Sequence, residues 1–396
     1  MKTAYDTLSL YSVFEDKLMQ NNRIFKILQE LVRIPSQYGK EQEISSWIFD
    51  FLTDLGYEPF TVEVPESGPD VIAEFEVDPN KPWILLNSHS DTVEKMRGWT
   101  RDPYGERVGD KFYGIGACDM KSGLAVQLGI MEGLLKGEFK PKLNVLFTAV
   151  TDEELWSRGT ITLIDKNIIS PDKVAYAIVG EPHYLGNFLV GRRGRLILDI
   201  VVHGKAAHGA TPKRGVNAIN EAARLIQSLE ALDVGYMEEF NIEGSQCILA
   251  INDGVNSLSV PETVKLVLDR HYLPIETAGM VVEAVLEIIQ NTGLDPNKVE
   301  VSIHPRPTRA PLPYYTPLDN PLVQITAEEI KLATGIEPRF LLGRTVADSN
   351  FIGMLGIPTI DLGPSGKGSH SADEWCDVKS LQQLYHVYKG ILAQLN

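Results

Sequence analysis

The sequence predicts an α/β protein in which a domain built on a central mixed, largely parallel sheet is interrupted by an inserted α+β domain. Three observations support this prediction. The length of 396 residues suits two domains of ordinary size. Up to residue 190, strand-like apolar runs alternate with amphipathic helical segments, as in a layered α/β domain. Beyond residue 190 the expected order changes to β-α-β-β-α-β, which is that of a ferredoxin-like sandwich.

The first part of the chain supplies the alternating elements. Apolar residues at helical spacing predict helices at 24–34 and 43–55, and Gly56 ends the second one. Further along we expect strands at 61–64, 71–75, 83–87, 145–150 and 174–179, and helices at 121–135 and 160–166. Such an alternation favours a largely parallel sheet covered by helices.

The inserted part has its own set of elements. We expect strands at 196–202, 246–251, 264–272 and 299–303, and helices at 217–232 and 277–289. The proline-rich segment "HPRPTRAPLPYYTP" then leads back to a helix at 322–333 and the strand "IPTIDLG". We therefore expect a discontinuous catalytic domain, 1–190 plus 305–396, and an inserted domain at 191–304.

Composition narrows the function classes. A formal net charge of -16 argues against a nucleic-acid or anionic-membrane partner. Cys118, Cys247 and Cys376 are widely spaced and form no C-x-x-C pair, which argues against a disulfide framework and fits a reducing compartment. The N-terminal "MKTAYDTLSLYSVFEDKLMQNNR" lacks the apolar core of a signal peptide, and no stretch is long enough to cross a bilayer. We expect a cytoplasmic protein.

Acidic and histidine residues follow the apolar strands directly. Four such groups are Ser88-His89-Ser90-Asp91, Asp152-Glu153-Glu154, Glu181-Pro182 and His370-Ser371-Ala372-Asp373-Glu374. A fifth candidate, Asp119 in "GIGACDMKSG", lies on a glycine-rich turn that opens a helix. Open α/β sheets gather ligands beyond the carboxyl ends of their strands, so these five segments are expected to converge.

Histidine and carboxylate ligands in this number suit zinc, cobalt or manganese. Two divalent ions would also neutralise the repulsion among Asp152, Glu153 and Glu154. Taken singly, each group has a simpler explanation: a strand-end histidine or glutamate is usually solvated or capping, and three acids are an ordinary helix start. "GIGACDMKSG" lacks the spacing and the preceding strand of a dinucleotide site. Five such groups, four of them at strand ends, together favour a metal site.

These motifs resemble a known family. "SHSDTV", "GIGACDMKSG", "TDEE", "VGEP" and "HSADEW" are similar, in order and spacing, to the motifs of the aminoacylase, acetylornithine deacetylase and succinyl-diaminopimelate desuccinylase family of dinuclear metallohydrolases. The resemblance covers nearly the whole chain. It implies a zinc-peptidase-type catalytic domain and an inserted "lid" domain through which two copies form a homodimer.

The resemblance also implies the ligands of two metal ions per chain, with Zn²⁺ as the first expectation and Co²⁺ or Mn²⁺ as alternatives. One ion would be held by His89 and Glu181, the other by His370 and Glu154, with Asp119 bridging both and a cis peptide bond following it.

Two further acids complete the expected catalytic centre. Asp91, two residues after His89, would accept the second N–H of that imidazole and fix its tautomer. Glu153 would take a proton from a metal-bound water and pass it to the leaving nitrogen. Adjacent glutamates would then have different tasks, because one stays on metal while its neighbour stays free.

Three residues are expected to contact the substrate or the transition state. His208 in "HGKAAHGATPKRG" matches the family pattern H-G-x-x-x-H-(G/S)-x-x-P and would stabilise the oxyanion, although spacing alone fits a capping or surface histidine equally. Arg270 in "LDRHYLP" matches a lid arginine that meets substrate carboxylate, with an exposed strand arginine as the alternative. Thr345 in "GRTVADSNF" belongs to the family's substrate loop.

Two departures from the family pattern leave the substrate open. Many relatives have an asparagine three residues before the lid proline, where this chain has Leu258, with Asn256 displaced. Ser349-Asn350 also stands where several relatives have an arginine.

The expected function is hydrolysis of the amide bond of N-acyl amino acids or small peptides. Glu181, where aminopeptidase relatives tend to have aspartate, favours the deacylase or carboxypeptidase type. A catalytically inactive assembly or regulatory subunit is the first alternative, and the intact Glu153 argues against it. A phosphoesterase, the second alternative, would need a different ligand order.

Overall fold

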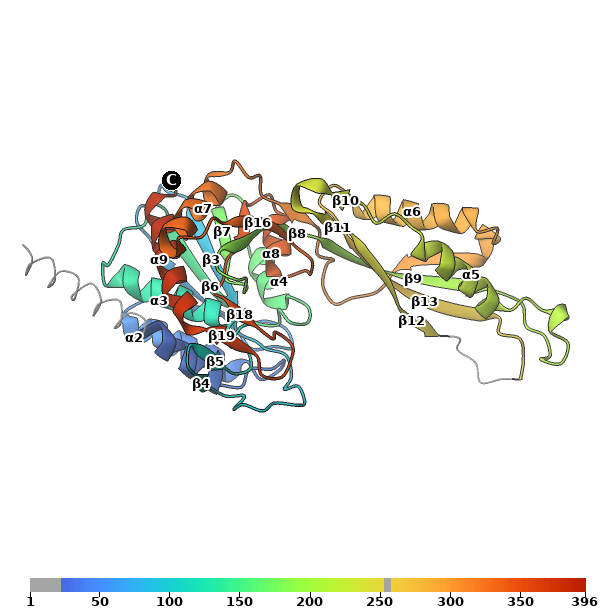
Figure 1. Cartoon of the computed structure of the whole chain (residues 1–396), viewed down its shortest axis with the longest axis horizontal. Coiled ribbons are helices and arrows are strands. Elements are labelled where there is room, and N and C mark those ends of the chain that lie inside the picture. The colour runs from blue at the N-terminus through green and yellow to red at the C-terminus, as the bar shows by residue number, and fades with distance from the viewer. Residues whose placement is uncertain (1–22, 253–257) are drawn as a thin grey trace, which may run out of the picture. The chain divides into compact units, whose positions relative to one another are not determined.

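The computed structural model describes residues 23–252 and 258–396 (Figure 1). The N-terminal segment without a signal-peptide pattern and the displaced Asn256 lie outside these ranges. The chain forms two compact units. The first runs up to Gly191 and includes Tyr315–Leu341 and Ala347–Asn396, and the second comprises Arg192–Tyr314 and Leu342–Val346.

A mixed nine-stranded sheet forms the centre of the first unit in the described part of the chain. Its order is β1-β2-β6-β3-β7-β17-β8-β15, with β16 paired to β8. The strands are β1 (Phe60–Val62), β2 (Asp70–Phe75), β3 (Trp83–His89), β6 (Asn144–Val150), β7 (Val174–Val179), β8 (Asn187–Arg192), β15 (Tyr314–Tyr315), β16 (Arg339–Gly343) and β17 (Thr359–Asp361). The four neighbours β6, β3, β7 and β17 run parallel. This confirms the α/β fold class.

Parallel pairing places the carboxyl ends of these central strands at one edge of the sheet. His89, the last residue of β3, pairs with Val150, the last residue of β6. On the other side of β3, Asn87 pairs with Val179, the last residue of β7. All seven residues of β6 are buried, which explains why its sequence is a continuous apolar run rather than an alternating one.

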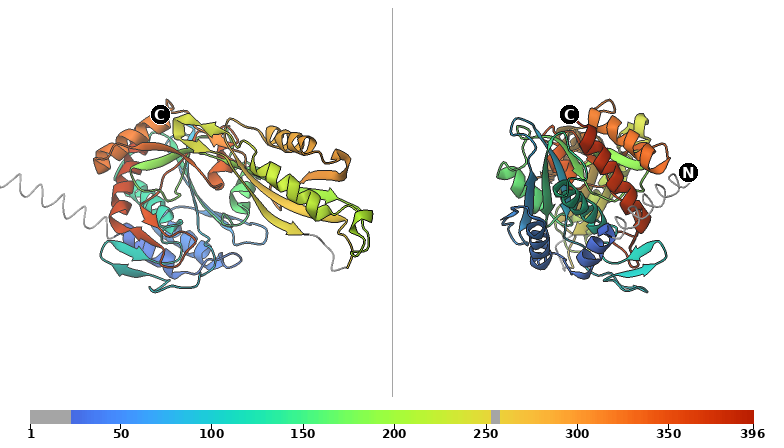
Figure 2. Two further views of the ribbon diagram at one scale, coloured as in Figure 1. Left: turned by 45° about the vertical axis from the view of Figure 1, so that its right-hand side comes forward. Right: turned by 90° about the vertical axis from the view of Figure 1, so that its left-hand side faces the viewer.

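Helices complete the first unit. Residues 23–33 are helical. The others are α2 (Gln42–Leu55), α3 (Lys121–Leu135), α4 (Arg158–Asp165), α7 (Pro321–Thr334), α8 (Asp348–Gly353) and α9 (Val378–Gln394). Figure 2 shows α9, in red, alongside α3, and these two helices pack together. A Cβ atom on Gly123 would come within 2.0 Å of the Gly180 carbonyl oxygen, so glycine lets the first turn of α3 approach the end of β7.

A small antiparallel sheet of short strands was not predicted from the sequence. It has the order β18-β19-β5-β4 and consists of β4 (Glu106–Val108), β5 (Lys111–Tyr113), β18 (Gly366–Lys367) and β19 (Trp375–Asp377). Strands of two or three residues are too short to show a period of two. The loop between β18 and β19 carries His370, so this sheet matters for the site.

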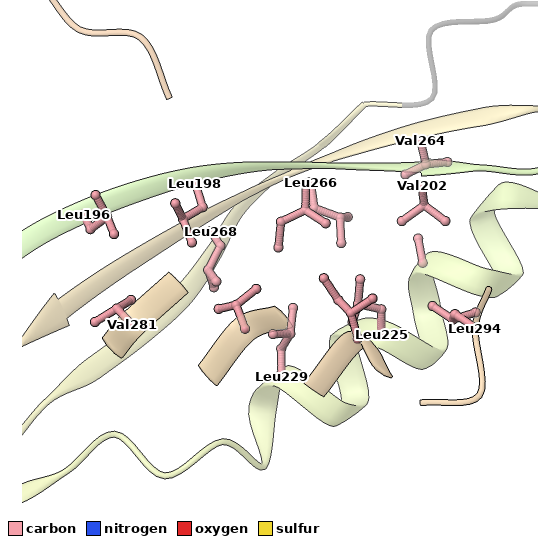
Figure 3. Packing of buried hydrophobic residues seen from close by; sticks show 14 of the residues in the cluster. Leu196, Leu198, Val202, Leu225, Leu229, Val264, Leu266, Leu268, Val281 and Leu294 are labelled. Atoms are coloured by element: carbon pink, nitrogen blue, oxygen red, sulfur yellow. The ribbon is translucent and has the colours of Figure 1, made fainter. Parts of the chain in front are cut away.

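The second unit has the expected β-α-β-β-α-β order. Its elements are β9 (Gly194–His203), α5 (Ala218–Glu230), β12 (Ser245–Asn252), β13 (Thr263–Tyr272), α6 (Ala278–Asn291) and β14 (Val299–Ile303), with a short added hairpin of β10 (Tyr236–Met237) and β11 (Ile242–Glu243). The sheet is antiparallel in the order β12-β13-β9-β14. Buried side chains of β9, β13 and both helices form its core, for example Leu198, Leu225, Leu266 and Val281 (Figure 3).

A partly buried ion pair lies on this sheet. Arg195 Nε and Nη2 donate to the two carboxylate oxygens of Asp269, each at 2.9 Å, and His271 Nε2 lies 3.6 Å from Oδ2. Burial alone would raise the pKa of Asp269, but the contacts with His271 and Arg195 outweigh it and lower the pKa from 3.8 to about 2. Because the folded pKa is depressed, the pair stabilises the fold above pH 3.8 and this contribution disappears as pH falls through about 2.

Replacing this carboxylate tests the pair. We expect Asp269→Asn to lower the free energy of unfolding at pH 7 by about 2 kcal/mol, because a charge-assisted pair is lost. Urea denaturation at several pH values should show the difference between wild type and variant shrinking as pH falls from 4 towards 2. Glu300→Gln, which removes an exposed partner of His203, is the control and should change stability little. A difference that is independent of pH would contradict the assignment.

Candidate active site

The five candidate ligands come from adjacent elements of the first unit. His89 ends β3, Glu154 follows β6, and Glu181 follows β7. Asp119 precedes α3, and His370 lies between β18 and β19. Since β6, β3 and β7 are neighbouring parallel strands, their ends deliver these side chains to one place.

The side chains form two groups that share Asp119. In the first group, His89 Nε2 lies 3.4 Å from Asp119 Oδ1 and 3.7 Å from Glu181 Oε1. In the second, His370 Nε2 lies 3.6 Å from Asp119 Oδ2 and 2.8 Å from Glu154 Oε2. The two oxygens of one carboxylate therefore face two different histidines. This is the arrangement that a bridging carboxylate needs.

Glu153 lies beside the first group. Its Oε2 is 3.9 Å from His89 Nε2, and potential ligand atoms of His89, Glu153 and Glu181 lie within 4.8 Å of one another. The same holds for His89, Asp119 and Glu154. Geometry alone thus leaves Glu153 two interpretations, as a ligand of the first group or as a free base beside it.

Asp91 holds the turn that carries both glutamates. Its Oδ1 accepts the N–H of Glu153 at 3.2 Å and its Oδ2 accepts the N–H of Glu154 at 3.1 Å. Asp152, just before them, has a left-handed φ of 64°, a conformation that is uncommon outside glycine and that concentrates at functional sites. His89 Nδ1 lies 3.0 Å from the main-chain oxygen of Asp91 and 3.6 Å from Oδ1. The nearer acceptor for the imidazole is thus the main chain, and the carboxylate mainly holds the turn.

The pKa shifts in the site indicate an excess of negative charge that is not neutralised by the protein. Burial, together with Glu181 and other nearby acids, raises the pKa of Glu153 well above its usual value. Burial lowers the pKa of His89, but Asp119 and the surrounding carboxylates outweigh it and raise this pKa well above its usual value. The hydrogen bond with Glu154 raises the pKa of His370 to about 9. Without another cation, the protein favours protons on all three groups.

Two buried ligand atoms support the fit of a metal. His89 Nε2 and Glu154 Oε1 have no hydrogen-bond partner in the described structure, although buried polar atoms are normally paired. Imidazole nitrogen and carboxylate oxygen are the donor set of zinc, cobalt and manganese sites. The residues present therefore fit two divalent ions.

Glu374 was named in the sequence only as a member of the His370 group, and its role in the site was not predicted. Its Oε1 accepts the N–H groups of Cys118 and Asp119, both at 2.8 Å, and its Oε2 accepts that of Gly116 at 3.0 Å. Its main-chain oxygen accepts the N–H of Gly114 at 3.0 Å. Glu374 thereby holds the loop that presents Asp119, whose peptide bond to Met120 is cis as expected. The sequence feature that could have indicated this role is the position of Glu374, four residues after His370.

The remaining expected residues lie in the second unit. His208 is exposed, and its Nδ1 accepts the N–H of Ala210 at 3.0 Å. Arg270 is only 2% exposed and donates to Glu276 Oε1 at 2.8 Å, so the alternative of an exposed strand arginine is wrong. Thr345 is exposed and its Oγ1 accepts from Arg192 Nη1 at 3.1 Å.

The length and hydropathy of the helices bear on whether the chain could cross a membrane. Across residues 23–252 and 258–396, none is both long and apolar enough to cross a bilayer.

Known proteins are similar to this chain over most of its length. The chain is 30% identical to the succinyl-diaminopimelate desuccinylase of Acinetobacter baylyi over 324 residues, covering 80% of this chain and 84% of the relative. It is 28% identical to the enzyme of the same name from Shewanella piezotolerans over 386 residues, covering 95% and 98%.

Solved structures share the fold. A tripeptidase from Staphylococcus aureus superposes with a TM-score of 0.77 at 21% identity, covering 94% of this chain and 98% of that one. A dinuclear metal-binding peptidase of the M20 family from Bacillus subtilis gives a TM-score of 0.72 at 16% identity, covering 95% and 98%.

The sequence model of Peptidase family M20/M25/M40 matches residues 85–394, which is well over half of the chain and includes all five candidate ligands. The chain therefore belongs to this family of metal-dependent hydrolases.

Proposed function

We propose that the protein is a dinuclear metal-dependent hydrolase that cleaves the amide bond of N-acyl amino acids or small peptides. The observation that carries this proposal is the Asp119 carboxylate, whose two oxygens face His89 and His370. The relatives named desuccinylase and tripeptidase support the same reaction class.

The residues would divide between two ions. His89 and Glu181 would bind the first ion, and His370 and Glu154 would bind the second. Asp119 would bind both ions. Divalent ions in these positions, Zn²⁺ first, would polarise the scissile carbonyl and lower the pKa of the attacking water.

Glu153 would act as the general base of this reaction. Its carboxylate lies at the edge of the first group, while its neighbour Glu154 is engaged by His370. It would accept a proton from the attacking water and deliver it to the leaving nitrogen. Asp91 supports this role because it fixes the main chain of Glu153.

His208 would stabilise the oxyanion from a partner subunit. In the second unit, β12 and β14 are edge strands, and edge strands can pair with a second copy in a two-fold dimer. Leu249 and Ile251 on β12 and Ile303 on β14 are each more than half exposed, which favours a covered surface there. The exposed His208 would then donate a hydrogen bond in the partner's site.

The function is tested with a substrate panel. We expect the zinc- or cobalt-loaded protein to hydrolyse N-acyl amino acids or dipeptides and to leave aryl phosphates intact. Elemental analysis should approach about two ions per chain, and a chelator should abolish turnover reversibly. Full metal content without hydrolysis of any amide would favour the inactive assembly or regulatory subunit instead.

The two glutamates are separated by paired variants. Glu153→Gln keeps the side-chain shape but removes the base, so turnover should fall by about 10²–10⁴ while both ions stay bound. Glu154→Gln should lose one ion, because its carboxylate pairs with His370 in the second group. Metal content and kcat are measured on both. Loss of an ion from Glu153→Gln would identify Glu153 as a ligand.

Cross-subunit action is tested by mixing inactive variants. His208→Ala should keep both ions and lose about 10²–10³-fold in kcat, because an oxyanion donor is missing. Mixing it with Glu153→Gln should restore activity, since a heterodimer contains one site with both groups intact. Freely exchanging subunits without recovered activity would place His208 in its own chain's site or outside catalysis.

A further inference from the structure

A cavity of about 340 Å³ in the first unit is lined by segments that also carry candidate ligands. Three of its lining residues are chain neighbours of those ligands: Cys118 precedes Asp119, Pro182 follows Glu181 and Ser369 precedes His370. The volume lies in the range of small-molecule sites. The cavity is therefore placed to receive a part of the molecule that the site acts on.

Lys367 gives this cavity its charge. None of the lining residues carries a carboxylate, and Lys367 is the only lysine or arginine among them. Its side chain is exposed, and its ammonium group has no hydrogen bond or ion pair with any described residue. Other lysines nearby are engaged: Lys379 pairs with Asp110, and Lys111 lies over the ring of Trp375.

The backbone holds Lys367 in place. It belongs to β18 and pairs with Trp375 of β19, while Gly366 pairs with Cys376. A Cβ atom on Gly366 would come within 2.5 Å of Cys118 Sγ, so this strand lies directly against the loop that leads to Asp119. The ammonium therefore extends from a paired strand, three residues before His370, rather than from a free loop.

We propose that Lys367 is a specificity-determining residue and that this cavity binds a carboxylate of the substrate. Pro182, Tyr184 and Leu341 supply apolar surface for a short hydrocarbon chain, and the ammonium supplies a charge-assisted hydrogen bond at its end. The carboxylate is either the distal one of a dicarboxylic acyl group or the one of the amino acid released. This inference rests on the proposed hydrolase function.

Two pairs of matched substrates distinguish the two possible carboxylates, that of the acyl group and that of the amino acid. The first pair is an N-succinyl amino acid and its neutral N-succinamyl analogue, and the second is an N-acetyl amino acid and its carboxamide. On the pair whose carboxylate meets Lys367, we expect Lys367→Met to lower kcat/KM for the acid by about 10-fold or more and for the amide by less than about 2-fold. Lys111→Met, a lysine of the same small sheet outside the cavity, is the control and should change neither.

Equilibrium binding supplies an independent readout. Calorimetric titration of the metal-loaded protein with succinate and with glycine should show weaker binding of the matching carboxylate to Lys367→Met than to wild type. Equal losses on acid and amide substrates, or equal affinities of wild type and Lys367→Met, would overturn the inference. Absence of turnover on every amide would overturn the hydrolase function instead, and the titration would still decide the carboxylate site.

Discussion

The repulsion among four carboxylates in one buried space is the constraint on which the site depends. Asp119, Glu153, Glu154 and Glu181 lie around His89 and His370, and both imidazoles are driven towards their charged form. Removing such groups from water costs several kcal/mol per ion unless opposite charge is supplied. The fold accepts this arrangement because its residues fit divalent cations, which would supply that charge.

Backbone donors, rather than side-chain cations, hold the acids in place. Glu374 takes three N–H groups of the loop before α3, and Asp91 takes those of Glu153 and Glu154. Arginine or lysine in these positions would compete with a metal for the ligand oxygens. By using supporting carboxylates on the backbone, the protein orients the candidate ligands and leaves their own atoms available, as supporting groups around metal sites commonly do.

Much of this arrangement was predictable because it rests on long elements. The parallel strands β3, β6 and β7 are apolar runs, and their ends mark where His89, Glu154 and Glu181 must gather. The two-residue strand β18 and the contacts of Glu374 were not predicted, because they depend on tertiary pairing rather than on local periodicity. The helix α9 was also not predicted, although its buried apolar residues recur at helical spacing. Arg270 likewise shows no sign in the sequence of its burial against Glu276.

The adjacency of Glu153 and Glu154 follows from the turn that they share. Asp152 turns the chain through a left-handed residue as β6 ends, and the two following N–H groups are held by the two oxygens of one carboxylate, Asp91. With both main-chain positions fixed, the two side chains diverge, one towards His370 and one towards His89. A rigid turn can thus give two identical side chains different surroundings, and those surroundings set the chemical properties of each carboxylate.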